Sequence, residues 1–581
     1  MTKQTSETID VDVLVVGGGL AGCFAAIRAR EFCAKVALVE KAVVARSGSA
    51  VFCHDFLAPL PEGELDNWLR DIVEHTEFMS DQRYAEILLL EQRDRLNDLV
   101  SWGVPFERDE AGQLLLSVGR GHKRSRVVLG DCRKMLEIAK AVAVSKGVKL
   151  IERVMVTDLL TSDGHHPTKG KIMGAVGIHT RGGGFITFKA RAVILCTGVI
   201  GTKIHGAYAD NLTGDGQAMA FRAGAELAGL EFNFGSSFFT PCRGKPALVG
   251  IWALQTLGAH IVNKQGERFM ERYVPERGDR RATQGLIAQA MTKEIMEGRG
   301  PTYFDIRHFA PEKYSQLERI LPIRMAAFRD AGLDLRKDLL DCRPVLTYIG
   351  TGGCGGIRIN LFGETNIPGL LAAGVSAQFP GCAESLSGVK LAYSGVLGYR
   401  AGERAGEYAR QADESRPDPD QLARVKEQVL SPLSRKDGPS PGQLYSRLSQ
   451  LLARPNISFI KTETGIRKVL ALAKEVEGEF GQVSARDTHQ LVKANELRSL
   501  ISLLPPVFTC SLERKESRLT HYRVEYPYRD DVEWLKWLVI NQGDRGLEVT
   551  AVPLPLKENR IQLASRQRIP SPIQVSLPES G

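Results

Sequence analysis

A glycine-rich turn near the start of the chain constrains the fold more than any other feature. After a strand-like apolar run at residues 13–16, Gly17, Gly19 and Gly22 form the spacing G-x-G-x-x-G ahead of a helix-like segment of small residues. The first glycine permits a tight turn, the second lets the backbone approach a pyrophosphate, and the third allows close packing of helix on sheet. A second strand-like run ends at Glu40, 18 residues after Gly22, where a carboxylate can accept hydrogen bonds from ribose hydroxyls. The segment therefore predicts a Rossmann-type dinucleotide site in an α/β fold.

Two later segments repeat the pattern of glycines before a helix, at residues 211–224 (NLTGDGQAMAFRAG) and 384–402 (ESLSGVKLAYSGVLGYRAG). A polar loop of small residues, KAVVARSGSA, also follows Glu40. NAD needs one phosphate-binding turn, whereas FAD extends across the sheet and uses several such turns. We therefore predict that the dinucleotide is FAD.

The pattern of segments divides the chain into five regions. Strand-like and helix-like segments alternate over residues 1–235, which we predict to be the first part of the FAD-binding domain. Residues 236–345 lose the alternation, which predicts an inserted α+β cap domain. The FAD-binding domain resumes over residues 346–412, a helical C-terminal domain follows at 413–515, and a Pro-rich C-terminal tail closes the chain at 516–581. The two helices expected in the cap span Thr283–Gly298 and Pro311–Ala331.

Cysteines, apolar runs and charges narrow the range of functions. Ten dispersed cysteines include no C-x-x-C pair, so the chain encodes neither a ferredoxin-type cluster nor a zinc ribbon, and we predict no metal site. The N-terminus lacks an apolar segment and no apolar run reaches ~18 residues, so we expect a soluble cytoplasmic protein. The net charge of +8 is spread along the chain, and the one dense basic run, GRGHKRSR at residues 119–126, has no interleaved aromatic residues. We expect no nucleic-acid binding and interpret this run as a solvated loop, with docking of an acidic partner protein as the alternative.

Seven segments spread over nearly the whole chain carry a further resemblance: VVGGGLAG, VEKAVVARSG, RAVILCTG, TGDGQAMAFRAGAEL, NKQGERFMERYVPE, IPGLLAAG and RKESRLTHYRVEYPYRDDVEWLKW. Together they resemble the flavoproteins of the fumarate reductase and succinate dehydrogenase type, a family that includes L-aspartate oxidase and the adenylylsulfate reductase alpha subunit. GLAGCFAA and VEKAVVARSG look closest to the adenylylsulfate reductase branch. The resemblance implies a FAD-dependent redox subunit that works beside an iron–sulfur, ferredoxin-like protein within a larger complex.

The resemblance also implies the cofactor contacts. Asp215 would lie beside the flavin ribityl chain or ring, and Lys390 could join a helix dipole in stabilising negative charge at the flavin N1/C2=O edge. The full set of implied contacts is Gly17, Gly19, Gly22, Glu40, Lys41, Arg46, Ser47, Gly48, Val154, Thr197, Gly198, Asp215, Gly374, Ser387, Gly388, Lys390 and Leu391.

Two positions depart from the family pattern around the cofactor. Where members with covalent flavin have a histidine after the Arg-Ser pair, this chain has Gly48, so we expect FAD to be bound non-covalently. Where the family has an acidic residue after the glycine of AAG, this chain has Val375, which cannot accept a hydrogen bond from the ribityl chain.

The dicarboxylate machinery of fumarate reductases is also replaced. The proton-delivering arginine corresponds to Gln284, the substrate-clamping arginine to Ser385, and one histidine to Thr351, while GSSFFTPCRG lacks the other histidine. A charge-assisted arginine–carboxylate contact is worth ~1.5–3 kcal/mol, so losing several would weaken binding by orders of magnitude. We therefore predict that the chain is not a classical fumarate reductase.

Four residues are candidates for the chemistry. Arg243 falls where the adenylylsulfate reductase branch has an active-site arginine and would bind an anionic substrate, with a surface ion pair as the alternative. Gln284 occupies the vacated proton-delivery position, and Arg281 flanks it, as a cleft residue or a solvated charge. Cys354 would lie near the flavin as a redox thiol or as a small buried filler between glycines. A lone histidine, His54, follows the cofactor loop, and we interpret it as structural.

These observations predict an oxidoreductase whose FAD exchanges hydride or electrons between a small substrate and an iron–sulfur partner. Two alternatives remain open at this point. One is an electron-transfer subunit with no substrate of its own, which the missing substrate residues favour. The other is an enzyme like adenylylsulfate reductase, although that branch's histidine near YIGTGGCGG is absent here. An open, polar pocket beside the flavin would favour the enzyme, and a flavin sealed by apolar residues would favour the relay.

Overall fold

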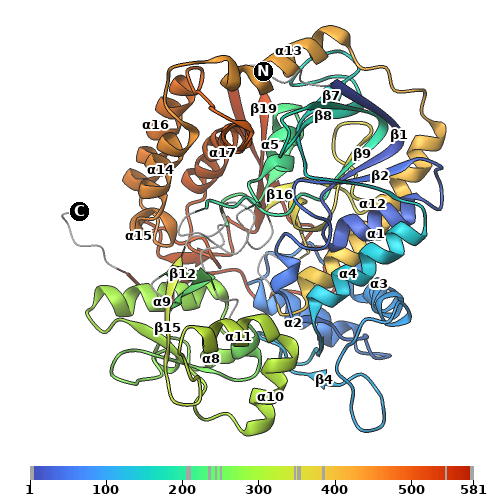
Figure 1. Ribbon diagram of the computed structural model, residues 1–581. Coiled ribbons are helices and arrows are strands. Elements are labelled where there is room, and N and C mark those ends of the chain that lie inside the picture. Colours follow the sequence, from blue (N-terminus) through green and yellow to red (C-terminus); the bar gives the residue numbers. More distant parts are fainter. Residues whose placement is uncertain are drawn as a thin grey trace.

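A seven-stranded sheet holds the glycine-rich turn at the end of one of its strands (Figure 1). β1 (Ser6–Val16) and β2 (Val36–Glu40) are parallel and connected by α1 (Leu20–Ala29), as the glycine spacing predicts. The order across the sheet is β6-β2-β1-β9-β8-β7, and β17 also pairs with β9. The other strands are β6 (Lys149–Glu152), β7 (Val154–Thr161), β8 (Ile172–His179), β9 (Phe185–Leu195) and β17 (Leu370–Ala372). This computed structural model describes residues 6–203, 211–232, 237–242, 245–248, 252–345, 349, 355–381, 386–543 and 546–575.

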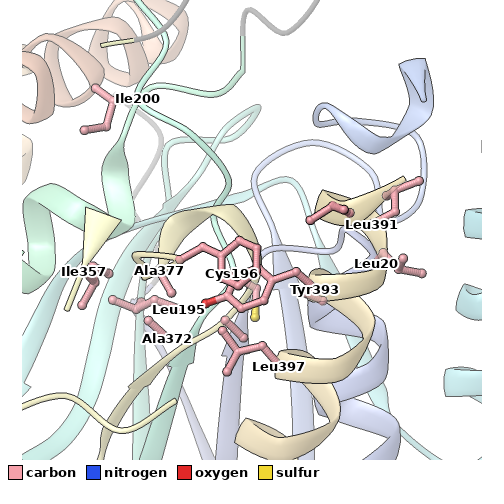
Figure 2. Packing of buried hydrophobic residues seen from close by; sticks show 14 of the residues in the cluster. Leu20, Leu195, Cys196, Ile200, Ile357, Ala372, Ala377, Leu391, Tyr393 and Leu397 are labelled. Atoms are coloured by element: carbon pink, nitrogen blue, oxygen red, sulfur yellow. The ribbon is translucent and has the colours of Figure 1, made fainter. Parts of the chain in front are cut away.

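The long helix α12 (Val389–Gln411) returns the chain to this sheet and packs against α1. Glycines make the close approach possible: a Cβ at Gly398 would lie 2.5 Å from the carbonyl oxygen of Ala21, and one at Gly402 would lie 2.3 Å from that of Ala25. Because the two glycines are four residues apart, they share one face of the helix. Figure 2 shows the resulting core, in which Leu391, Tyr393 and Leu397 of α12 are grouped with Leu20 of α1 and with Leu195 and Cys196 at the end of β9.

The region between residues 237 and 345 is a mixed α/β lobe, at the bottom of Figure 1. Its five-stranded sheet has the order β12-β11-β15-β14-β13. The strands are β11 (Ser237–Cys242), β12 (Lys245–Leu248), β13 (His260–Val262), β14 (Thr302–Asp305) and β15 (Leu340–Val345). The first helices of this lobe are α6 (Trp252–Thr256), α7 (Met270–Tyr273), α8 (Gly278–Arg281) and α9 (Gln284–Met296). The content is that of the α+β cap expected from the sequence.

The helix expected over Pro311–Ala331 is in fact two helices, α10 (Pro311–Ile320) and α11 (Pro322–Asp330). Leu321 between them has φ −133° and ψ 49°, outside the helical region. Pro322 has no N–H to donate and is suited to the first turn of a new helix. The prediction of one continuous helix was therefore wrong.

The C-terminal region begins with helices and ends with strands. The longer helices are α13 (Pro419–Ser434), α14 (Pro441–Leu452), α16 (Glu463–Phe480) and α17 (Thr488–Glu513). The segment predicted to be a tail includes β19 (Lys536–Gly543), which pairs with β20 (Gly546–Pro553) and with β10 (Leu227–Ala228). The end of the chain is therefore built into the fold. Within the described residues, the structure has no helix that is both long and apolar enough to cross a membrane.

Apart from the exposed Lys515, the basic segment RKESRLTHYR lies inside the molecule. Arg514 pairs with Glu231 and Glu516 at 2.7 Å, and Arg518 pairs with Glu516 and Asp531 at 2.9 Å; all of these side chains have no exposed surface. Buried charges are tolerated only when they are paired and hydrogen-bonded. The segment is therefore an ion-pair scaffold within the fold.

Candidate active site

A cavity lies at the edge of the sheet where β1, β2 and β9 end and where α1 and α12 begin. It contains about 1590 Å³ of empty space, including the part open to solvent. Ordinary small-molecule sites occupy roughly 300–1,000 Å³, so this space suits an extended dinucleotide with a second molecule beside it. The predicted cofactor contacts that line it are Gly17, Gly19, Glu40, Lys41, Ser47, Gly48, Val154, Thr197, Gly198, Asp215, Gly374, Ser387, Gly388, Lys390 and Leu391.

The glycine turn has the geometry that each glycine was expected to supply. Gly17 has φ 111°, and a Cβ there would lie 2.2 Å from the carbonyl oxygen of Cys196. A Cβ at Gly22 would lie 1.9 Å from the carbonyl oxygen of Gly17, so this glycine packs behind the turn and does not line the cavity. At Gly19, which precedes α1, a Cβ would meet no atom within 4 Å. That open space and the positive end of α1 suit an approaching phosphate.

The Glu40 side chain holds the loop that follows it in the sequence. Its carboxylate accepts hydrogen bonds from the backbone N–H of Gly18 at 2.7 Å, from that of Ala42 at 3.0 Å, and from the Ser47 hydroxyl at 2.9 Å. An ionised carboxylate offers about four acceptor positions, so these three bonds leave capacity for a ligand hydroxyl. The side chain thus holds the turn and lines the cavity at once.

Lys41 and Asp215, both predicted cofactor contacts, bind each other at the cavity wall. The Lys41 Nζ donates to Asp215 at 2.9 Å, to Thr213 Oγ1 at 2.8 Å and to Glu496 of α17 at 2.9 Å. Burial lowers the pKa of Lys41, but the two carboxylates outweigh burial and hold this pKa above its ordinary value. Lys203 also pairs with Glu496, so the C-terminal helix reaches this wall, which the sequence did not predict.

Gly48 and Gly388 both line the cavity and both have a positive φ. Gly48 has φ 85°, and a Cβ there would meet no atom within 4 Å. A residue with a side chain would be strained in this backbone conformation, although the side chain itself would meet open space. Glycine suits the position, in keeping with the prediction that no residue attaches the flavin here. Gly388 precedes α12 with φ 76°, and a Cβ there would lie 2.8 Å from the backbone N of Leu57. Next to it, the Ser387 hydroxyl donates to Asp55.

Several predicted residues lie elsewhere. Arg46 is exposed and does not line the cavity. Arg281 is also exposed, and its Nη2 donates to the carbonyl oxygen of Glu276 at 2.7 Å, outside the cavity. Gln284 does line the cavity, at the start of α9, and is 2% exposed. The remaining candidates, Arg243, Ser385, Thr351 and Cys354, lie outside the described residues.

Two residues that line the cavity were missed as candidates. His54 is 2% exposed, and Arg120, also in the cavity wall, is 3% exposed. They come from loops 66 positions apart in the sequence, so spacing alone could not bring them together. Asp55, Gln284 and Lys390 line the same cavity. No signal in the sequence would single out Arg120 from the other basic residues of the run at 119–126.

That basic run, residues 119–126, is not the solvated loop that was predicted. Gly119, Arg120, Gly121 and His122 are buried, and only Lys123 is fully exposed. The exposed half is paired within the chain: Lys123 Nζ lies 3.0 Å from Glu74, and the Arg124 guanidinium lies 3.0 Å from Asp71. These pairs neutralise the charges that were proposed to attract an acidic partner protein.

Comparison with known proteins agrees with this geometry. Residues 12–391 match the family model described as FAD binding domain, and residues 447–568 match the one described as fumarate reductase flavoprotein C-term. The chain belongs to the flavoprotein family of fumarate reductase and succinate dehydrogenase. It is therefore an FAD-dependent oxidoreductase, as the sequence predicted.

Individual relatives cover nearly the whole flavoprotein. A CoM/CoB fumarate reductase subunit of Methanothermobacter marburgensis is 29% identical over 557 residues, which is 92% of this chain and 98% of the relative. L-aspartate oxidase of Streptomyces coelicolor is 28% identical over 568 residues, 94% of each chain. Two solved structures share the fold. The FrdA chain of Escherichia coli quinol fumarate reductase has a TM-score of 0.84 at 23% identity, and the match covers 96% of this chain and 99% of FrdA. Adenylylsulfate reductase of Archaeoglobus fulgidus has a TM-score of 0.80 (21% identity, 95% and 97% coverage).

The residues present fit FAD. The Gly19 space at the start of α1 suits the pyrophosphate, and the free acceptor capacity of Glu40 suits a ribose. Gly388 and Lys390, at the start of α12, provide a second positive helix end for the flavin ring. When bound, the flavin supplies hydride and one-electron chemistry. The residues of the protein itself would bind and orient this flavin.

Proposed function

We propose that this flavoprotein is the cytoplasmic, FAD-carrying subunit of an oxidoreductase complex in which a small substrate and an iron–sulfur protein exchange electrons through the flavin. The observation that carries the proposal is a set of polar side chains in the cavity wall. His54, Asp55, Arg120 and Gln284 line the same space as the phosphate-binding turn, and the space opens to solvent. A site of this kind can admit and orient a polar substrate.

The same observation weighs against an electron-transfer subunit without a substrate. His54 is buried in the cavity wall and neither of its ring nitrogens has a hydrogen-bond partner among the described residues, a cost that a bound substrate would offset and a relay flavin would not need. An enzyme like adenylylsulfate reductase remains a further alternative, and it is supported by likeness of fold alone.

An iron–sulfur partner is proposed from the family, whose flavoprotein subunits work in complexes with iron–sulfur subunits. The ten cysteines include no C-x-x-C spacing, and the described residues hold no group of three or more His, Cys, Asp or Glu side chains that could bind a metal ion. Several relatives are also named as subunits of larger enzymes, among them the Methanothermobacter marburgensis protein.

Purification from the native host at low salt, followed by metal analysis, tests the proposal. We expect the flavoprotein to co-purify with an iron-containing protein, and its flavin to be reduced through that protein and not by NAD(P)H. A chain that purifies alone, free of iron, and is reduced by NAD(P)H would contradict the proposal and indicate a self-contained dehydrogenase.

A further inference from the structure

A chain of buried hydrogen bonds connects α2 (Leu65–His75) with the start of α12, behind the cavity wall. The Ser125 Oγ lies 2.7 Å from Asp71 Oδ2 and 2.5 Å from His122 Nδ1. The other ring nitrogen, His122 Nε2, lies 2.8 Å from the carbonyl oxygen of Ser387, which lines the cavity. Asp71, Ser125 and His122 are each 2% exposed, so no solvent competes for these contacts.

Asp71 can only accept hydrogen bonds in this chain. Its Oδ2 accepts from the backbone N–H groups of Lys123, Arg124 and Ser125 at 3.1, 2.7 and 2.8 Å. Its Oδ1 accepts from the Arg124 guanidinium at 3.0 Å. Burial raises the pKa of Asp71, but the hydrogen bonds from Ser125 and Arg124 outweigh burial and lower it below its ordinary value. The carboxylate is thus ionised at pH 7, and the Ser125 hydroxyl donates its one hydrogen to it.

His122 is then one hydrogen short. Because the Ser125 hydrogen points to Asp71, the Ser125 oxygen accepts from His122 Nδ1, and the Ser387 carbonyl accepts from His122 Nε2. These two contacts need two N–H groups, whereas a neutral imidazole has one. One contact of the neutral ring therefore brings two lone pairs face to face. An imidazolium has both N–H groups and would complete the chain.

The charges around His122 keep that extra proton off at pH 7. Burial lowers the pKa of His122, and the positive charge of Arg120 lowers it further. The Ser387 carbonyl and the carboxylates of Asp71 and Asp55 act in the opposite direction without reversing the shift. The other charged or titratable groups on the elements around this loop are His75, Lys123, Arg124, Arg280 and Lys390. A gain of negative charge in the cavity would shift this balance toward the protonated ring, because charges in buried surroundings are weakly screened.

We propose that His122 takes up one proton from solvent when reduction of the bound flavin adds negative charge to the cavity. The electrons are those of the oxidoreductase reaction. The ring gains its second N–H and donates to both Ser125 and the Ser387 carbonyl, and no other covalent bond changes. The new positive charge lies beside the start of α12, where the helix dipole also favours negative charge in the cavity. The inference requires FAD but no particular substrate or partner, so it goes beyond the proposed function.

Spectroelectrochemical titration of the FAD-loaded protein at several pH values between 6 and 8 tests the inference. One extra proton per two electrons steepens the dependence of the flavin midpoint potential on pH by up to about 30 mV per pH unit, the value of a tenfold change for a two-electron couple. We expect this steeper dependence in the unmodified protein and its loss in His122→Gln. The matched control is His489→Gln, which removes an exposed histidine of α17 outside the cavity and should keep the dependence.

Ser125→Ala separates the hydrogen count from the presence of the ring. It keeps His122 but removes the acceptor of the Nδ1–H, so the neutral ring lacks no hydrogen and the dependence should match that of His122→Gln. Ser125→Thr restores a hydroxyl and should restore the steeper dependence.

If His122→Gln loses FAD, proton uptake during electrochemical reduction, measured with a pH indicator, gives the same comparison between the unmodified protein and Ser125→Ala. We expect more protons per flavin in the unmodified protein. Equal pH dependence in the unmodified protein and in the His122 and Ser125→Ala variants, or equal proton uptake, would overturn the inference. An iron–sulfur partner can co-purify in either case, so that result would leave the proposed function standing.

Discussion

The three glycines of the β1–α1 turn act through three different spaces. Gly17 avoids a backbone clash, Gly19 leaves room for a ligand, and Gly22 lets α1 approach the turn. These roles follow from local spacing, which is why the sequence could predict them. The polar residues His54 and Arg120 could not be found in this way, because their proximity depends on how distant loops fold.

Gly22→Ala tests the role of the third glycine. The added Cβ would lie 1.9 Å from the carbonyl oxygen of Gly17, and backbone on both sides cannot yield without moving the turn. We expect a loss of about 1–3 kcal/mol of stability and a lower FAD content, measured by thermal unfolding and flavin absorbance. The control is Gly478→Ala, also in a helix, where a Cβ meets nothing within 4 Å; it should keep its FAD and gain up to ~1 kcal/mol. Full FAD content and unchanged stability in Gly22→Ala would contradict this account.

Gln284 leads to a prediction about activity. It lines the cavity where fumarate reductases are expected to have a proton-delivering arginine, and an amide cannot deliver a proton. We therefore expect no appreciable fumarate reduction or succinate oxidation in dye-coupled assays. Turnover of about 1 per second, within the ordinary range of enzymes, would show that another residue delivers the proton.

At the scale of elements, one buried carboxylate joins three of them. Asp158 of β7 accepts hydrogen bonds from Arg498 of α17 at 2.8 and 2.9 Å and from Arg222 of α5 (Asp215–Arg222) at 3.0 Å. Burial raises the pKa of Asp158, but the two arginines outweigh burial and lower it to about 2. Asp158 is 1% exposed, so this cluster attaches the C-terminal helices to the sheet from inside.

Asp158→Asn should therefore cost about 3–5 kcal/mol at pH 7, because it leaves buried arginines without their counter-charge. Since an unfolded aspartate has a pKa of about 3.9, the unfolded chain binds more protons between about pH 4 and pH 2. The stabilisation by this carboxylate is complete above that window and is lost as the pH falls through it, so the variant should show a flatter acid dependence. Melting temperatures from pH 3 to 7 measure both effects. The control is Asp66→Asn, which removes an exposed pair with Arg560 and should change the free energy of unfolding by less than about 1 kcal/mol. Equal losses of stability in the two variants would refute the role of Asp158.

Other elements show where sequence patterns reach their limit. The β1–α1–β2 unit was predictable because its signals are local. The basic run at residues 119–126 was interpreted as solvated because charge runs usually are, but Asp71 and Glu74 on α2 (Leu65–His75) accept its charges. The break between α10 and α11 was overlooked because the apolar pattern continues across Leu321 although Pro322 cannot continue the hydrogen-bond ladder. In both cases a tertiary or backbone constraint outweighed the pattern.

At the scale of the whole molecule, segments distant in the sequence meet at one cavity. The wall of this cavity includes residues from the glycine turn, the loop around His54, the loop around Arg120, α9 of the cap-like lobe and the start of α12. The C-terminal helix α17 reaches the same wall through Glu496 and Lys41. The FAD-binding, cap and helical regions therefore follow one another in the sequence, but residues from all of them contribute to the site. The glycine turn, Gln284 and Lys390 were named from the sequence, whereas Arg120 was not and His54 was interpreted as structural.

Acid precipitation of the purified flavoprotein tests the central claim most directly. Gly48 leaves no side chain for attachment at the expected position, and the cavity otherwise holds the residues of a non-covalent FAD site. The account predicts that the supernatant contains a yellow compound with the mass of FAD, in an amount near one per chain, and that the pellet is colourless. Flavin that remains on the precipitated protein, or a supernatant without FAD, would contradict it.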